Sequence, residues 1–166
     1  MKSILPTDVR ICPFEIEHYD AAVVLWERSK QIGLSSADGR EAIKVFLLRN
    51  RGLSKVAISN TGLVGAVLCG HDGRRGYLYH LCVEEGLRLR GLGRELVNAC
   101  LDGLKNEGIQ KCHVFIFNDN ESGMGFWARV SWRKRDDIAV FSRDIGTNPA
   151  GSRNGNHTHG NAGEPN

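Results

Sequence analysis

A short segment rich in glycine and arginine carries the clearest chemical pattern of the sequence. Residues 83–94 read VEEGLRLRGLGR, with glycines at 91 and 93 and arginines at 88, 90 and 94. Glycine lets the backbone approach a ligand closely, and the first amide N–H groups of a helix lack partners and favour an anion. Arginine side chains add positive charge and bind phosphate oxygens. If a helix begins here, the segment predicts a binding site for a diphosphate.

The flanking residues support that placement. Residues 77–83 are apolar or aromatic at nearly every position, which is typical of a buried strand. An apolar stripe from Leu92 to Leu104 predicts a helix that Gly108 ends. An ordinary solvated connection would show the same glycines and arginines, so their position between strand and helix is what favours the anion site. A dinucleotide-binding fingerprint fits less well, because the next strand ends in Phe117-Asn118 rather than in an acidic residue.

The other elements follow from the same patterns. Alternation before Pro13 predicts an edge strand, Asn60-Thr61-Gly62 predicts a hairpin, and Asp38-x-x-Glu41 resembles a capping box that opens a helix. The expected strands are 9–11, 56–59, 63–69, 77–83, 111–117 and 137–143, and the expected helices are 18–32, 38–47, 92–107 and 120–130. The first of these helices should bury Ala21, Leu25, Arg28 (through its stem) and Ile32. The fold class is α/β, or α+β, with a mixed sheet and helices on both faces.

Composition describes an ordinary globular chain of 166 residues with a net charge of +3, too weakly basic to predict nucleic-acid binding. Five cysteines without a paired spacing indicate reduced thiols in a cytoplasmic protein rather than a disulfide framework or a zinc site. We expect no membrane span and no signal peptide. One folded domain, residues 1–145, should precede a disordered Gly/Asn-rich tail, residues 146–166. His157 and His159 in that tail lack further ligands, so no metal is expected.

Two motifs at the right separation make the sequence resemble the GNAT N-acetyltransferase superfamily. Val83-x4-Arg88-x-x-Gly91-x-Gly93 is similar to the family signature V-x4-[QR]-x-x-G-x-[GA], and Asn120-x-x-Gly123-x-x-Phe126-Trp127 is similar to its later N-x-x-A-x-x-F-Y block. The order of elements agrees over nearly the whole folded part. The segment GHDGRRGYLY at residues 70–79 most resembles small bacterial YpeA-like acetyltransferases.

The resemblance implies a mostly antiparallel sheet whose strands splay apart to hold acetyl-CoA as co-substrate. Strand residues would pair with the pantetheine, the amides of the glycine-rich loop with Arg94 would hold the pyrophosphate, and Asn120 would contact the pantetheine from the opposite wall. The Val83 N–H would stabilise the developing oxyanion. The residues so assigned to the cofactor are Leu81, Cys82, Val83, Arg88, Leu89, Arg90, Gly91, Leu92, Gly93, Arg94, Asn120 and Trp127.

The implied reaction is direct attack of an amine on the thioester in a ternary complex. An amine is mostly protonated at neutral pH, so a general base is wanted, and His80, Glu84 and Glu85 are the candidates. His80 also fits a packed strand histidine, and the two glutamates also fit solvated charges that steer a cationic substrate. Cys82 is a candidate for a covalent acyl-enzyme, although a buried strand cysteine usually behaves as a small hydrophobe.

The sequence departs from the family at the general acid. Trp127 stands where the family has a tyrosine, and an indole cannot protonate a thiolate. A catalytically degenerate acyl-CoA-binding module is therefore the alternative to an active enzyme. The acceptor amine, whether small molecule, amino acid or protein α-amine, should meet Trp26, Ser35 and Tyr79, although Trp26 equally fits a residue of the core. The protein is expected to be a monomer or a homodimer.

Overall fold

The computed structural model describes residues 8–146. The chain divides into two compact units, Met1–Arg133 and Lys134–Asn166. The elements of the first unit are β1 (Arg10–Pro13), α1 (Tyr19–Glu27), α2 (Arg40–Arg49), β2 (Lys55–Ser59), β3 (Gly62–His71), β4 (Gly76–Val83), α3 (Leu92–Asn106), β5 (Cys112–Val114) and α4 (Glu121–Arg129), with short 3-10 turns η1 (Ile16–His18), η2 (Ser36–Asp38) and η3 (Glu85–Leu87).

The five strands form one sheet in the order β1-β2-β3-β4-β5. The first four are antiparallel neighbours, and β5 alone runs parallel to its neighbour β4. β1 lies at an edge of the sheet and includes Pro13. Proline has no N–H to donate to a second neighbouring strand, which suits it to an edge strand. The predicted mixed, mostly antiparallel sheet is thereby confirmed.

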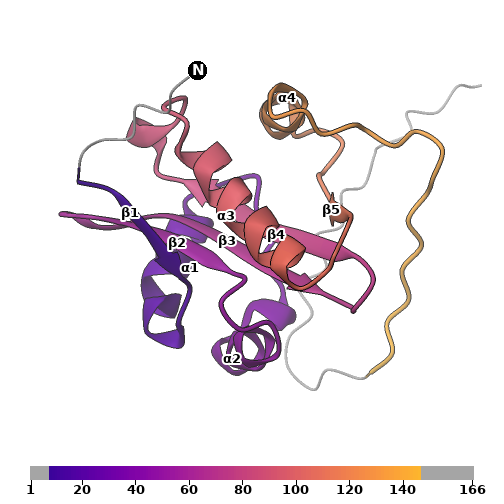
Figure 1. Cartoon of the computed structure of the whole chain (residues 1–166), viewed down its shortest axis with the longest axis horizontal. Helices are drawn as coiled ribbons and strands as arrows, with labels where there is room; N and C mark the ends of the chain where they lie inside the picture. The colour runs from indigo at the N-terminus through magenta and orange to yellow at the C-terminus, as the bar shows by residue number, and fades with distance from the viewer. Residues whose placement is uncertain (1–7, 147–166) are drawn as a thin grey trace, which may run out of the picture. The chain divides into compact units, whose positions relative to one another are not determined.

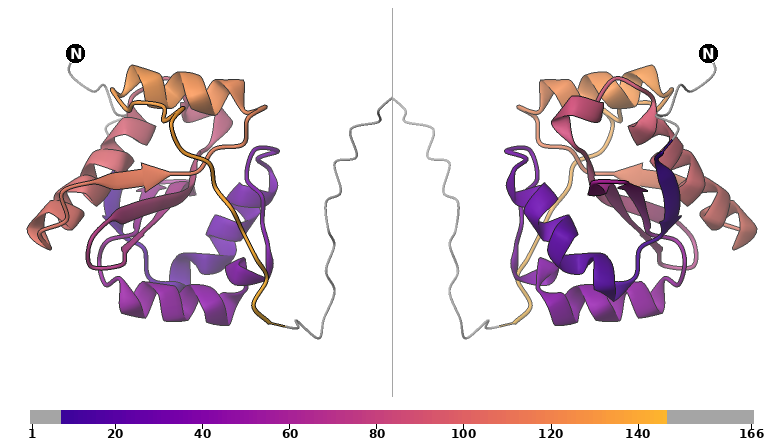
Figure 2. Two further views of the ribbon diagram at one scale, coloured as in Figure 1. Left: turned by 90° about the vertical axis from the view of Figure 1, so that its right-hand side faces the viewer. Right: turned by 90° about the vertical axis from the view of Figure 1, so that its left-hand side faces the viewer.

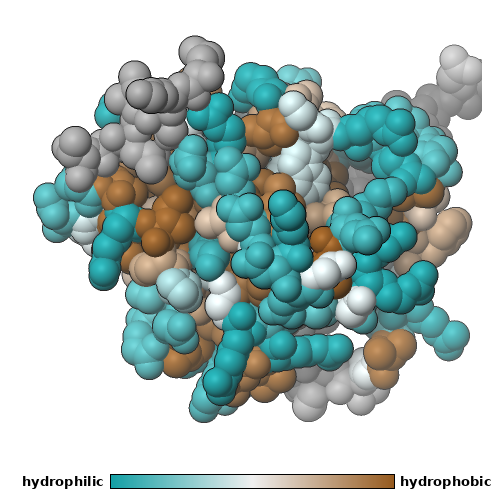
Figure 3. Space-filling view, in the orientation of Figure 1, coloured by the Kyte–Doolittle hydropathy of each residue, from teal (hydrophilic) through white to brown (hydrophobic). Residues whose placement is uncertain are grey.

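Helices cover both faces of the sheet, as predicted (Figures 1 and 2). α1 and α2 pack on one face through Ala22, Leu25, Trp26, Ile43 and Leu47. α3 packs on the other through a stripe that runs from Leu92 to Leu104. β3 lies between the two layers, which explains why seven consecutive residues of it are buried. The outer side of α3 is mainly hydrophilic (Figure 3), as expected for an amphipathic helix.

Three sequence predictions are wrong in detail. α1 ends at Glu27 rather than near residue 32, and it buries Ala22 and Trp26 instead of Ala21 and Arg28. The reason is that the tryptophan, a large apolar surface, takes the core position. Asp38 does not open α2, because Gly39 is the N-cap of that helix and Asp38 closes the preceding turn η2.

The second unit has no helix or strand within its described residues, 134–146. The predicted strand 137–143 is therefore wrong. Its apolar residues are exposed, Phe141 by 94%, so an apolar run alone did not give this segment a face to bury. Ion pairs between Lys134 and Asp136 and between Arg135 and Asp137 organise it locally.

The predicted tail lies outside the described residues, apart from Gly146, and the domain boundary at residue 145 stays a prediction. Within residues 8–146, no helix is both long and apolar enough to cross a membrane. The same residues contain no cluster of three or more histidine, cysteine or acidic side chains that could hold a metal ion.

Candidate active site

The site forms where β4 and β5 part. The two strands pair only from Gly76 to Leu78, against Cys112 to Val114, and β4 then continues to Val83 paired with β3 alone (Figure 1). A cavity of about 840 Å³ opens along this gap. It is lined by the second half of β4, the loop that leads into α3, residues 114–117, the length of α4 and the connection between α1 and α2. Ser122 Oγ donates to Gln31 Oε1 at 3.3 Å, which joins α4 to that connection.

A β-bulge in β4 shapes the middle of the gap. The register against β3 shifts between Tyr79 and Cys82, so both His80 and Leu81 lie opposite Val67. His80 takes a φ of +52°, a left-handed conformation that is uncommon for a residue with a side chain. As a result, consecutive side chains face the α1–α2 side, where Tyr79 contacts Phe46 and His80 contacts Trp26.

Trp26 supports this bulge from the core. Its Nε1–H donates to the backbone carbonyl of His80 at 3.0 Å, and the indole and imidazole rings lie edge to face. The tryptophan is fully buried and does not line the cavity, so of its two predicted positions the structure places it in the core. A strained backbone conformation persists only where neighbouring groups stabilise it, and the hydrogen bond from Trp26 to the His80 carbonyl is one such contact.

His80 and Asp38 form a close pair at the cavity. His80 Nε2 lies 2.6 Å from Asp38 Oδ1, and the two side chains are only 17% and 12% exposed. Asp38 is itself fixed, since its carboxylate accepts from the Ser35 N–H at 2.7 Å and its carbonyl accepts from Tyr19 Oη at 2.8 Å. Because an ionised carboxylate only accepts, His80 Nε2–H donates to Asp38, and Nδ1 is the ring nitrogen left for a proton from outside the pair.

Asp38 stays ionised under ordinary conditions. Burial raises the pKa of this carboxyl, but hydrogen bonds from His80 and Ser35 and the charge of His80 outweigh that effect. The pKa of Asp38 therefore lies below its ordinary value. A fixed carboxylate behind an imidazole orients the ring and stabilises its protonated form, an arrangement that supports general base catalysis. Ser35, a predicted substrate contact, acts here only through Asp38 and does not line the cavity.

The two candidate glutamates differ in position. Glu84 donates its N–H to the Val64 carbonyl at 2.9 Å, precedes the turn η3, and does not line the cavity. Glu85 is exposed and lines it. No fixed partner orients either carboxylate in the described part of the chain, whereas His80 has one.

The end of β4 directs backbone groups into the gap. Because Glu84 pairs with Val64, the alternation of an antiparallel ladder turns the N–H and C=O of Val83 away from β3. Arg88 Nε donates to that Val83 carbonyl at 3.0 Å, which folds the arginine back over the strand end.

The glycine-rich loop lies at the start of α3. Gly91 is the N-cap with a φ of +91°, and no side chain caps the helix. No side-chain oxygen therefore accepts from the first amides of α3. Gly93 leaves no side chain in front of them, and a Cβ at this position would come within 3.2 Å of the Phe126 ring. Of the predicted pyrophosphate residues, Arg88, Leu89 and Gly93 line the cavity, whereas Arg90, Gly91, Leu92 and Arg94 lie beyond its wall.

The opposite wall comes from α4. Asn120 lines the cavity and caps the helix, accepting from the Gly123 N–H at 2.7 Å, as its position predicted. Trp127 also lines the cavity but is 7% exposed, and its ring packs on Trp132 at 4.6 Å. Trp127 is therefore a wall residue with no acidic proton to give.

Cys82 does not have the surroundings of a nucleophile. It is buried, its Sγ–H points to the Leu25 carbonyl at 3.8 Å, and burial raises the pKa of the thiol. A thiol must ionise to attack a thioester. The structure favours the packed hydrophobe over the acyl-enzyme.

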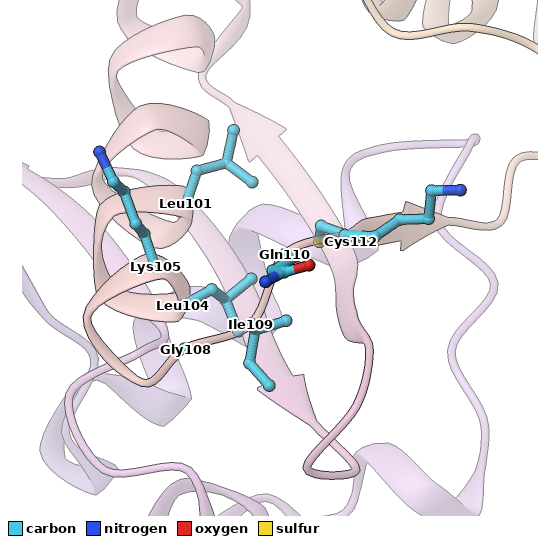
Figure 4. A pocket seen from close by; sticks show the side chains of 8 residues that line it. Leu101, Leu104, Lys105, Gly108, Ile109, Gln110 and Cys112 are labelled. Carbon is cyan, nitrogen blue, oxygen red and sulfur yellow. The ribbon is translucent and has the colours of Figure 1, made fainter.

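A second cavity of about 530 Å³ lies at the far end of α3 (Figure 4). Leu101, Leu104 and Ile109 line it beside Cys112, whose pKa burial raises to about 12. It contains no paired acid and base among its lining residues.

Comparison with known proteins agrees with this geometry. The model of the acetyltransferase (GNAT) family matches residues 19–132. An acetyltransferase of Pectobacterium atrosepticum is 30% identical over 138 residues, which cover 83% of this chain and 96% of the relative. The chain belongs to the GNAT acetyltransferase family. It is an acetyl-CoA-dependent acetyltransferase, as the two sequence motifs predicted.

Solved structures show the same fold. The PaiA N-acetyltransferase of Thermoplasma acidophilum, in complex with coenzyme A, superposes with a TM-score of 0.69 at 15% identity over 80% of this chain and 94% of that one. AAC(6')-Iy in complex with the bisubstrate analogue CoA-S-monomethyl-acetylneamine gives 0.67 at 14% identity over 84% and 100%. Fold class is therefore confirmed independently of sequence similarity.

Proposed function

We propose that this protein transfers the acetyl group of acetyl-CoA to a primary amine by direct attack in a ternary complex, with His80 as general base. The observation that carries the proposal is the buried His80–Asp38 pair on the wall of the cavity. Glu85 also lines the cavity but lacks an orienting partner, which makes it the weaker candidate for the base.

In this mechanism the amine nitrogen attacks the thioester carbon while His80 Nδ1 accepts the amine proton. Asp38 stabilises the imidazolium that results. The Val83 N–H, turned toward the gap, donates to the developing oxyanion. The carbon–sulfur bond then breaks and CoA leaves as the thiolate. A free thiol has a pKa of about 8.5, so the thiolate is a fair leaving group and needs no acid from Trp127.

The residues present suit acetyl-CoA as co-substrate. The uncapped start of α3 and the charge of Arg88 would hold the pyrophosphate, with further positive charge from Arg90 and Arg94 of the same loop. The backbone from Leu81 to Val83 would pair with the pantetheine, between Asn120 and Trp127 on the other wall. Support comes from the open edge of β4 beyond Leu78 and from the CoA-bound relative of the same fold.

A thiol-release assay over a panel of amines tests the proposal. With an accepted amine, His80→Gln should lower kcat by about 10²- to 10⁴-fold and leave the affinity for CoA unchanged. His71→Gln is the matched control, because His71 also pairs with a carboxylate, Glu107 at 2.9 Å, but does not line the cavity. Full activity of His80→Gln would remove His80 from the role of base.

The second candidate is an acyl-CoA-binding module without catalysis, which the tryptophan at position 127 favours. It predicts CoA binding by calorimetry together with no thiol release across the whole panel. An active enzyme predicts both binding and release, so the two measurements together decide between them.

The setting and subgroup are proposals of the same kind. All five cysteines are free thiols, which supports a reducing, cytoplasmic location. Similarity to a bacterial acetyltransferase over nearly its full length supports placement among the small bacterial YpeA-like enzymes. A monomer or homodimer remains our expectation for the assembly.

A further inference from the structure

The wall of the cavity that faces the α1–α2 side is aromatic and open. Tyr79, Phe115 and Phe117 all line the cavity and are 37%, 58% and 60% exposed. We call these three residues the aromatic wall. The sequence predicted a buried strand through Phe117, but β5 ends at Val114, and the alternation beyond it sends Val114 and Ile116 to the core and both phenylalanines outward.

Neighbouring residues fix the positions of the aromatic wall. The Tyr77 ring stacks on both Tyr79 and Phe115, with centroids 6.4 and 6.2 Å apart. Phe117 packs against the α1–α2 connection so closely that a Cβ at Gly33 would come within 2.8 Å of its ring. Exposed apolar rings held in fixed positions beside a cavity mark a surface that a ligand covers.

The aromatic wall adjoins the proposed base. The β4 bulge turns Tyr79 and His80 to the same side of the sheet, so one ring of the wall is the direct sequence neighbour of the imidazole. Burial, with a smaller effect of Tyr77, raises the pKa of Tyr79, so the phenol stays uncharged.

The charges around the cavity are distributed unequally. The charged residues of the lining, Glu85, Arg88, Glu121 and Arg129, come from the loop before α3 and from α4. The lining from β4, residues 114–117 and the α1–α2 connection contains no lysine, arginine, aspartate or glutamate. Apart from Asp38 behind His80, a second charged group on the substrate would meet no opposite charge in this part of the lining.

We propose that the acceptor is a primary amine attached by a short linker to a flat apolar group, such as an aromatic ring, which packs on Tyr79, Phe115 and Phe117 while the amine reaches His80. This inference rests on the proposed acetyl transfer to an amine and names its substrate class. Ring-on-ring packing then supplies the preference over polar amines.

The test compares phenethylamine with ethanolamine and spermidine as acceptors in the thiol-release assay. Wild-type protein should show a kcat/KM for phenethylamine at least about tenfold above that of either polar amine. In Phe115→Ser this ratio should fall to about threefold or less, with the KM for acetyl-CoA unchanged. Leu48→Ser is the matched control, because Leu48 is 57% exposed on α2 and does not line the cavity.

The outcomes distinguish failure of the aromatic acceptor from failure of the proposed acetyl transfer. Equal or faster acetylation of ethanolamine or spermidine by the wild type would overturn the aromatic acceptor and leave amine acetylation standing. An unchanged ratio in Phe115→Ser would overturn it as well. Silence with all three amines and with a broader panel, while CoA still binds, would overturn the acetyl transfer itself. The wild-type comparison decides even if the variant does not fold.

Discussion

Replacing Asp38 by asparagine isolates what the carboxylate does for His80. Asp38→Asn keeps the side-chain volume and removes the negative charge that faces His80 Nε2 at 2.6 Å. We expect kcat to fall while the KM for acetyl-CoA stays the same, because Asp38 lies behind the imidazole and does not line the cavity. Asp38 acts as a positioning residue, and its effect should appear in the chemical step.

The magnitude follows from burial. A hydrogen bond to a charged group contributes roughly 1.5–3 kcal/mol, and both side chains are largely shielded from water. At about 1.36 kcal/mol for each factor of ten, kcat should drop by about 10- to 150-fold. Asp20→Asn is the control. Asp20 pairs with Arg40 at 2.7 Å but is 79% exposed, and such surface pairs contribute only about 0–1 kcal/mol.

The same substitution makes a prediction for stability against pH. A carboxyl whose pKa is lowered in the folded state binds its proton less tightly there than in the unfolded chain. Its contribution is therefore fully present above the unfolded pKa, about 3.9, and is lost as the pH falls through the lower native value. The difference in unfolding free energy between wild type and Asp38→Asn should be largest at neutral pH and shrink in acid.

Steady-state kinetics with the best acceptor of the panel and denaturant unfolding at neutral and acid pH measure both effects. The reasoning is refuted if Asp38→Asn keeps more than half of the wild-type kcat at neutral pH. It is refuted equally if Asp20→Asn loses as much activity, since exposure would then not matter.

Three further predictions concern the loop, the thiol and the bulge. Gly91→Glu should abolish CoA binding in calorimetry. Gly73→Glu is its control, because Gly73 has a similar φ of +88° but lies in the β3–β4 turn, away from the loop. It introduces the same backbone strain of about 1–3 kcal/mol and should bind CoA normally. Cys82→Ala should keep kcat within about twofold, and a dead but folded variant would revive the acyl-enzyme. Trp26→Phe should destabilise the protein by about 1–3 kcal/mol in chemical unfolding and lower kcat without changing the KM for acetyl-CoA. A normal kcat would show that the bond to His80 does not hold the bulge.

Local patterns predicted most of the fold. Apolar patterns located α3, β2, β3 and β4 to within a few residues, because each element buries one face or both along its own length. Asn120 was found as a cap because a cap is a relation between neighbours. The failures have the opposite origin. The segment 137–143 contains a continuous apolar run, Ile138 to Phe141, as a strand often does, yet no ladder partner forms within its described residues, and an apolar run cannot supply one.

By itself, the sequence determined the cofactor half of this protein. A strand, a glycine-rich loop and the start of a helix are contiguous, so the residues that we propose to bind the pyrophosphate stand side by side in the chain. Only the tertiary structure decided which residues surround His80, where we propose that the acceptor amine binds. Asp38 meets His80 across 42 positions, and Trp26 reaches the His80 carbonyl across 54. Those contacts depend on how α1, η2 and β4 pack together, and the exposure of Phe115 and Phe117 depends on where β5 leaves β4. Packing of distant segments is a property of the whole core, and no local spacing records it.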